Sequence, residues 1–241
     1  MTHINALGPH DSLYHLFQPI YYLADEQPLG YEALIRNKQG LNPDELFDIA
    51  RAQNWLYELD TLSISGALTT FFASKTFNGS DELLFINILP STLTADAFPT
   101  FLAYVKIQFP SFLHRIVFEI NETILEGFIW DSIQFVERVA FLREEGFLVA
   151  LDDVGQGTSS LKKMVEIAPD FVKLDKFFSQ DLASSTSKQK IVRMLAEYGH
   201  GEFQFILEGI EHEDDFQKAV KLGVALGQGY FLGRPGPLRE S

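Results

Sequence analysis

The chain has 241 residues, a net charge of −14 and a hydrophobic content of 46%. The acidic balance excludes the binding of long nucleic acid through a basic surface, and the absence of cysteine excludes disulfides and thiolate metal sites. No run approaches the roughly 18 apolar residues of a membrane helix, and the first residues lack the regions of a signal peptide. We therefore expect a cytoplasmic protein without membrane association.

Apolar runs that alternate with amphipathic segments predict eight strands. They lie at 14–23, 29–35, 83–88, 115–120, 147–152, 171–175, 203–209 and near 225–231. The short connection from Ala24 to Pro28 predicts that the first two strands form an antiparallel hairpin. The other alternations predict a largely parallel sheet. In the absence of a Gly-rich dinucleotide turn, an α/β fold of the (β/α)8 TIM-like barrel type is favoured over an open doubly wound sheet.

The segments between the strands carry helix signals. Asn42 followed by Pro43 predicts a helix start. Further along, one helical stripe comprises Ile129, Ile133, Val136 and Ala140, and another comprises Phe216, Ala219 and Val220. No Gly-, Ser- or Pro-rich linker divides the chain, so we expect residues 1–241 to form a single domain.

A second pattern concerns the polar residues at the ends of the predicted strands. They are Glu32, Asn87, Glu119, Asp152, Asp153, Lys173, Glu208 and Gln228. A single carboxylate at such a place is usually a helix cap or a solvated charge. A series on successive strands is different, because the carboxyl ends of barrel strands meet on one face. Such a set of oxygen donors suits Mg²⁺ or Mn²⁺, and one lysine among the acids suits phosphate chemistry.

The adjacent pair Asp152 and Asp153 poses a geometric problem. Consecutive strand residues point to opposite faces, so two neighbouring carboxylates cannot both enter one site from a regular strand. We expect the chain to leave the strand at this pair, which Gly155 and Gly157 permit.

Eight motifs in order resemble the EAL domain family of cyclic di-GMP phosphodiesterases. They are FQPI (17–20), EALIR (32–36), FIN (85–87), FEINE (118–122), LDDVGQGTSSL (151–161), VKLD (172–175), EGIE (208–211) and QGYFLGRP (228–235). The resemblance implies a (β/α)8 barrel with one antiparallel strand. It also implies hydrolysis of cyclic di-GMP to linear pGpG, through in-line attack of a metal-bound water on one phosphodiester.

The resemblance also implies a role for each matching residue. A first Mg²⁺ or Mn²⁺ would be held by Glu32, Asn87, Glu119 and Asp152, and a second by Asp152 and Asp153. Lys173 would position the attacking water, with Glu208 as the candidate base and Asp153 also catalytic. The residues expected at the substrate-binding site are Gln18, Leu34 and Arg36, which would contact the dinucleotide, and Glu211 and Gln228, which would support the waters of the second metal. Glu122 would steady the loop that follows the aspartates.

That loop departs from the family pattern. It reads DVGQGTSSL where active members commonly read DFGTGYSSL, so Val154, Gln156 and Thr158 replace the usual residues. In the family this loop couples dimerisation to metal and substrate binding, and the resemblance therefore implies a homodimer and a regulatory protein partner. Besides an active enzyme, two alternatives stay open: a catalytically silent receptor for cyclic di-GMP, and a protein-interaction module that has lost the ligand.

Overall fold

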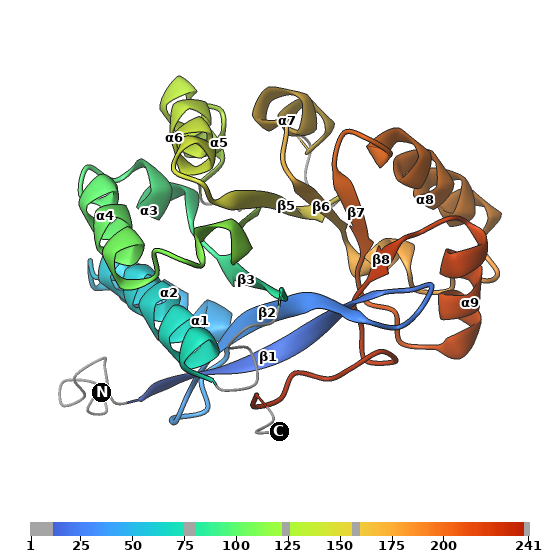
Figure 1. The fold of residues 1–241 in the computed structure, drawn as a ribbon, viewed down its shortest axis with the longest axis horizontal. Coiled ribbons are helices and arrows are strands. Elements are labelled where there is room, and N and C mark those ends of the chain that lie inside the picture. Colours follow the sequence, from blue (N-terminus) through green and yellow to red (C-terminus); the bar gives the residue numbers. More distant parts are fainter. Residues whose placement is uncertain (1–11, 75–80, 122–125, 156–159, 239–241) are drawn as a thin grey trace.

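The computed structural model describes residues 12–74, 81–121, 126–155 and 160–238. Within them, eight strands close into a barrel in chain order, and helices pack around its outside (Figure 1). The strands are β1 (Leu13–Tyr22), β2 (Pro28–Asn37), β3 (Leu83–Asn87), β4 (Ile116–Asn121), β5 (Leu148–Val154), β6 (Phe171–Leu174), β7 (Gln204–Leu207) and β8 (Leu226–Gly227). This confirms the predicted barrel, although β8 is shorter than expected.

The helices fill the connections between the strands. They are α1 (Pro43–Ala52), α2 (Leu56–Ala73), α3 (Pro90–Thr94), α4 (Phe98–Gln108), α5 (Gly127–Trp130), α6 (Ile133–Glu144), α7 (Ser160–Ile167), α8 (Thr186–Gly199) and α9 (Glu213–Lys221), with 3₁₀ turns η3 (Leu113–Arg115) and η5 (Lys176–Phe178). None of these helices is long and apolar enough to cross a membrane.

One strand runs against the others, as the hairpin predicts. β1 pairs antiparallel with both β2 and β8, whereas every other neighbouring pair from β2 to β8 is parallel. The hairpin closes through the Tyr22 amide, which donates to the Gln27 carbonyl at 2.9 Å. In its register Gln18, in the middle of β1, lies opposite Glu32, in the middle of β2.

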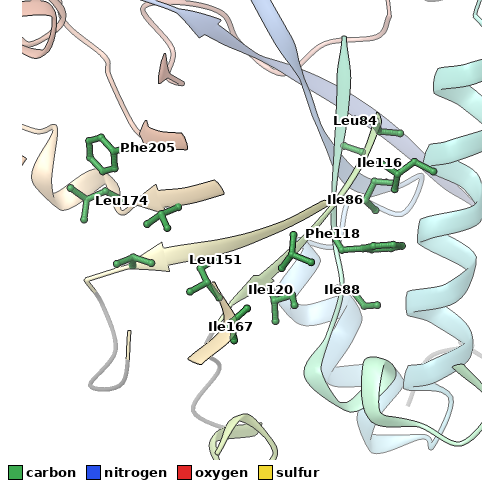
Figure 2. Packing of buried hydrophobic residues seen from close by; sticks show 14 of the residues in the cluster. Leu84, Ile86, Ile88, Ile116, Phe118, Ile120, Leu151, Ile167, Leu174 and Phe205 are labelled. Carbon is green, nitrogen blue, oxygen red and sulfur yellow. The ribbon is translucent and has the colours of Figure 1, made fainter. Parts of the chain in front are cut away.

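The strands bury side chains on both faces, with the alternation that the pleat requires. The faces turned into the barrel contribute a small cluster that includes Phe85, Val117, Phe171 and Ile206. The outward faces pack against the helices in a larger cluster, part of which is visible in Figure 2: Leu84, Ile86, Ile116, Phe118, Ile120, Leu151, Leu174 and Phe205. Each fully buried side chain contributes about 1.5–3 kcal/mol, and the inner cluster fills the barrel beneath the polar residues.

The helix starts are partly as expected. Asn42 caps α1 in a reciprocal capping box, since its side chain accepts from the Glu45 amide at 2.8 Å while the Glu45 carboxylate accepts from the Asn42 amide at 3.1 Å. The stripe expected from Ile129 to Ala140 is wrong. Ser132 begins a new helix by accepting from the Phe135 amide at 3.1 Å, which turns Phe135, Val139 and Leu142 to the core.

As a result, Ile133 is 78% exposed. In α9, Phe216 and Ala219 are buried as expected, but Val220 is exposed and Asp215 takes the third buried position. The Asp215 carboxylate accepts a hydrogen bond from the Ala183 amide at 2.8 Å. This hydrogen bond offsets part of the cost of burying a carboxylate on the apolar face of the helix.

Candidate active site

The pleat of the strands explains where the polar residues of the site lie. In the parallel strands, an inward apolar residue is followed two positions later by a polar one, because every second side chain faces the same way. The pairs are Phe85 and Asn87, Val117 and Glu119, Ala150 and Asp152, Phe171 and Lys173, Ile206 and Glu208, and Leu226 and Gln228. In β1 the direction is reversed, and Gln18 precedes the inward Ile20. Although β1 runs opposite to the other strands, its polar residue therefore lies at the same end of the barrel as theirs.

Lys173 is the centre of this polar layer. Its side chain is fully buried, and its ammonium lies 2.7 Å from Glu119 Oε1, 2.9 Å from Glu208 Oε1, 3.2 Å from Asp152 Oδ1 and 3.3 Å from Glu32 Oε2. These four carboxylates come from four different strands or strand ends. One cation therefore holds together an acid cluster whose members would otherwise repel one another.

Two side-chain amides complete the layer. Asn87 Nδ2 donates to Glu32 Oε1 at 3.3 Å and to Glu119 Oε2 at 3.4 Å, and Gln228 Nε2 donates to Glu32 Oε2 at 2.7 Å. The two Asn87 contacts are long, and a rotation of the amide would turn its oxygen toward the same point. Glu32, Asn87, Glu119 and Asp152, the residues expected to share one metal ion, thus meet around a common centre.

The turn at Asp152 and Asp153 differs from the expectation. The chain does not leave the sheet there, because β5 continues to Val154, which pairs with Leu174 after a break in the register. Asp153 itself makes the turn with a φ of +52°, the left-handed region that aspartate tolerates better than most residues. This bulge, rather than a glycine, allows adjacent carboxylates to serve one site.

Burial and neighbouring charges shift the pKa values of the acid cluster and of Lys173. Burial raises the pKa of Glu119 and of Glu208 well above the usual carboxylate range, and Lys173 opposes the rise in both. Burial also raises the pKa of Asp152, and together with the charge of Asp152 it raises the pKa of Asp153 to about 6. For Lys173, burial acts to lower the pKa, but the surrounding carboxylates raise it well above the ordinary value. The acids outnumber the cation, which favours binding of further positive charge.

The donor atoms fit a divalent metal ion. Carboxylate oxygens of Asp152, Asp153 and Glu208 all lie within 4.8 Å of one another. The available ligands are carboxylate and amide oxygens, the set that Mg²⁺ and Mn²⁺ prefer. Because Asp153 and Glu208 also line an open pocket, an ion could reach them from solvent.

Two pockets adjoin the polar layer. The first, which we call the acidic pocket, has a volume of about 320 Å³. It is lined by Gln18, Glu32, Asp153, Asp175, Lys176, Glu208, Gly209, Glu211, Gln228, Gly229 and Tyr230. The second, which we call the β2–β3 pocket, has a volume of about 490 Å³ and is lined by Leu34, Arg36 and Asn87 together with Phe47, Asp60 and others.

The pockets divide the residues that were expected to bind substrate. Gln18, Glu211 and Gln228 lie at the acidic pocket, whereas Leu34 and Arg36 lie at the β2–β3 pocket. Glu122, expected to steady the loop after the aspartates, lies outside the described residues, as do Gln156 and Thr158.

Sequence reasoning missed several residues that line the pockets. Asp175 follows Lys173 by two positions and Tyr230 follows Gln228 by two, so the same alternation would have found both. Asp60 lies on α2, where a helix rather than a strand carries it to the β2–β3 pocket. Its carboxylate accepts from the Leu89 amide at 3.0 Å, and burial raises its pKa to about 7.

Comparison with known proteins gives consistent matches. The family model described as "EAL domain" matches residues 5–235. The probable cyclic di-GMP phosphodiesterase PdeI of Escherichia coli is 30% identical over 232 residues, which cover 93% of this chain and 29% of the relative. The cyclic di-GMP phosphodiesterase PdeA of Borreliella burgdorferi is 30% identical over 199 residues, which cover 81% of this chain and 29% of the relative. The chain thus spans about a third of the length of these curated relatives.

Among solved structures, a manganese and cyclic di-GMP complex of Klebsiella pneumoniae BlrP1 at pH 6 superposes with a TM-score of 0.83 and 26% identity. The match covers 98% of this chain and 57% of that one.

Proposed function

Because the chain belongs to the EAL domain family, we propose that it hydrolyses cyclic di-GMP to linear pGpG with two Mg²⁺ or Mn²⁺ ions. The observation that carries this proposal is the convergence of Glu32, Glu119, Asp152 and Glu208 on the Lys173 ammonium. The names of the relatives support the substrate, and the manganese in the BlrP1 complex supports the type of cofactor.

The proposed metal ligands are those that the family resemblance implies. Glu32, Asn87, Glu119 and Asp152 would hold one ion, and Asp152 with Asp153 would hold the other. When bound, the two ions would supply positive charge to the phosphodiester and acidify water. Their charge would also relieve the repulsion that raises the carboxylate pKa values in this layer.

The side chains of the chain carry the rest of the reaction. The Lys173 ammonium orients the attacking water, and the Glu208 carboxylate beside it accepts the proton. The water oxygen forms a bond to phosphorus, the bond between phosphorus and the ribose 3′ oxygen breaks, and that oxygen takes up a proton. One cleavage of the ring leaves a 5′-phosphate and a free 3′-hydroxyl, which is linear pGpG.

A second candidate is a receptor that binds cyclic di-GMP without hydrolysing it. The sequence of the loop after Asp153 favours it, since Val154, Gln156 and Thr158 depart from the pattern of active members. The two candidates share the binding site and differ in turnover. Calorimetric binding together with unchanged cyclic di-GMP after incubation with either metal would establish the receptor.

The test of the enzyme is an assay of pGpG release with Mg²⁺ or Mn²⁺. The Glu32→Gln variant removes a charge that Lys173, Asn87 and Gln228 contact, and we expect activity to fall by at least about a hundredfold. Glu137→Gln, at an exposed position of α6, is the control and should keep full activity. Folding of both variants is checked by circular dichroism and thermal unfolding. No turnover by folded, metal-loaded wild-type protein would overturn the proposal.

A further inference from the structure

Among the described residues that line the acidic pocket, Lys176 is the single basic side chain. Five carboxylates share that lining with it: Glu32, Asp153, Asp175, Glu208 and Glu211. Lys173 is buried and does not line the pocket, and its ammonium contacts four carboxylates. The Lys176 side chain is exposed, and its ammonium has no hydrogen bond or ion pair with any other residue that the structure describes. It is the uncommitted positive charge of this pocket.

The backbone of Lys176 is held firmly even though its ammonium is free. Its carbonyl accepts hydrogen bonds from the Ser179 amide at 3.2 Å, the Gln180 amide at 3.1 Å and the Ser179 hydroxyl at 3.0 Å. The preceding residue, Asp175, caps the same turn by accepting from the Phe177 amide at 2.9 Å. The side chain therefore starts from a fixed point.

That point lies directly beside the end of β7. Gly209 follows Glu208 with a φ of +66°, and a Cβ added to it would clash with the Lys176 Cβ. The lack of a side chain at Gly209 lets the Lys176 stem pack against this residue, which follows the base candidate Glu208 in the chain. A lysine whose backbone is anchored, and whose ammonium has no partner among the described residues, can bind an anionic ligand.

The substrate supplies such an anion. Cyclic di-GMP carries two phosphodiesters, of which the one under attack would be neutralised by the metal ions. The other carries its negative charge into a site lined by carboxylates, where an unpaired anion is repelled. A cation at the pocket wall removes this penalty.

Resting on the proposed function, we infer that the Lys176 ammonium binds the phosphodiester of cyclic di-GMP that is not hydrolysed. Lys176 is thereby a substrate-positioning residue that touches the ligand and takes no part in proton transfer. It acts on substrate binding and leaves the chemical step to the acid cluster.

The test compares Lys176→Met, Lys176→Arg and Lys190→Met in cyclic di-GMP hydrolysis and in direct binding. Lys190 is exposed on α8, away from the acidic pocket, so its replacement removes the same charge elsewhere. We expect Lys176→Met to raise KM about tenfold with kcat nearly unchanged, the loss of one charge-assisted contact. Lys176→Arg should restore most of the affinity, and Lys190→Met should behave as wild type.

The dependence of affinity on salt concentration distinguishes an ionic contact from a structural effect. The gap in affinity between wild type and Lys176→Met should narrow as salt rises, because exposed charges are screened. Equal affinity of the two proteins at low salt overturns the inference, as does a loss that falls on kcat or on metal affinity instead. If wild-type protein neither binds nor hydrolyses cyclic di-GMP, it is the proposed function that fails. If it hydrolyses cyclic di-GMP and Lys176→Met matches it in KM and affinity, only the inference fails; if it binds without hydrolysis, the hydrolysis proposal fails and the inference is decided by the binding comparison alone.

Discussion

Replacement of Lys173 by methionine tests whether this lysine holds the acid cluster together. The change keeps most of the side-chain volume but removes the ammonium that lies 2.7–3.3 Å from four carboxylates. Removal of one partner from a buried ion pair costs about 3–5 kcal/mol. For a domain of this size, that loss lowers the melting temperature by roughly 6–20 °C. We expect a loss of this order in protein stripped of metal by a chelator.

Two further responses follow from the same electrostatics. Without Lys173, the pKa values of Glu119, Asp152 and Glu208 rise above their already raised values. A carboxylate with a raised pKa in the folded state is tolerated at low pH and destabilises the fold as pH rises through that pKa. The stability gap between wild type and variant should therefore widen as pH rises above the already raised carboxylate pKa values of the wild type, because below them the acids are protonated in both folded proteins. Mn²⁺, which can take over the positive charge, should stabilise the variant more than it stabilises wild type.

The assay is thermal unfolding followed by circular dichroism, with chelator and with Mn²⁺, over a range of pH. Lys163→Met is the matched control, because Lys163 is equally buried but pairs with Glu166 at 2.7 Å and Asp131 at 3.8 Å on the protein surface. Its replacement should cost less, with no response to Mn²⁺. Equal losses in the two variants, or a Lys173→Met protein that Mn²⁺ does not rescue, would refute the view of Lys173 as the internal counter-ion.

Three more substitutions probe groups around the site. His15 bonds Ser63 Oγ at 3.1 Å, and burial lowers its pKa to about 4, so wild type should lose up to about 3 kcal/mol as pH falls from the unfolded value toward 4; urea unfolding of His15→Gln should lack this slope. Burial raises the pKa of Asp60 to about 7, so ionisation of this carboxyl destabilises the fold as pH rises toward 7. Asp60→Asn should be more stable than wild type above that pH and similar to it at low pH. The reverse order of stability would contradict the raised pKa of Asp60. Gly209→Ala places a Cβ against Lys176 at positive φ, so the variant should lose about 1–3 kcal/mol of unfolding free energy and have a higher KM. An unchanged melting temperature would show that the backbone at Gly209 accommodates the added Cβ without strain.

The order of apolar and helical segments carried much of the prediction. Apolar runs between amphipathic segments were predicted as strands, and Asn87, Glu119 and Lys173 were noted as polar residues at or near their ends. Barrel closure then requires those ends to meet on one face. For helices the same reasoning was weaker, since the restart of the chain at Ser132 moved the buried stripe from Ile133 to Phe135.

The sequence by itself determined the fold type, the family and the set of residues that form the polar layer, because these depend on local periodicity and on motif order. Only the tertiary structure decided how those residues meet. It gave Lys173 four carboxylate partners and placed the turn of the aspartate pair at Asp153 instead of at a glycine. It also placed Lys176 at the pocket wall, without a partner for its ammonium among the described residues. Contacts across the fold determine which residues on different strands become partners, which residue adopts a left-handed φ and which carboxylate, such as Asp60, is buried. No local pattern of residues encodes these contacts.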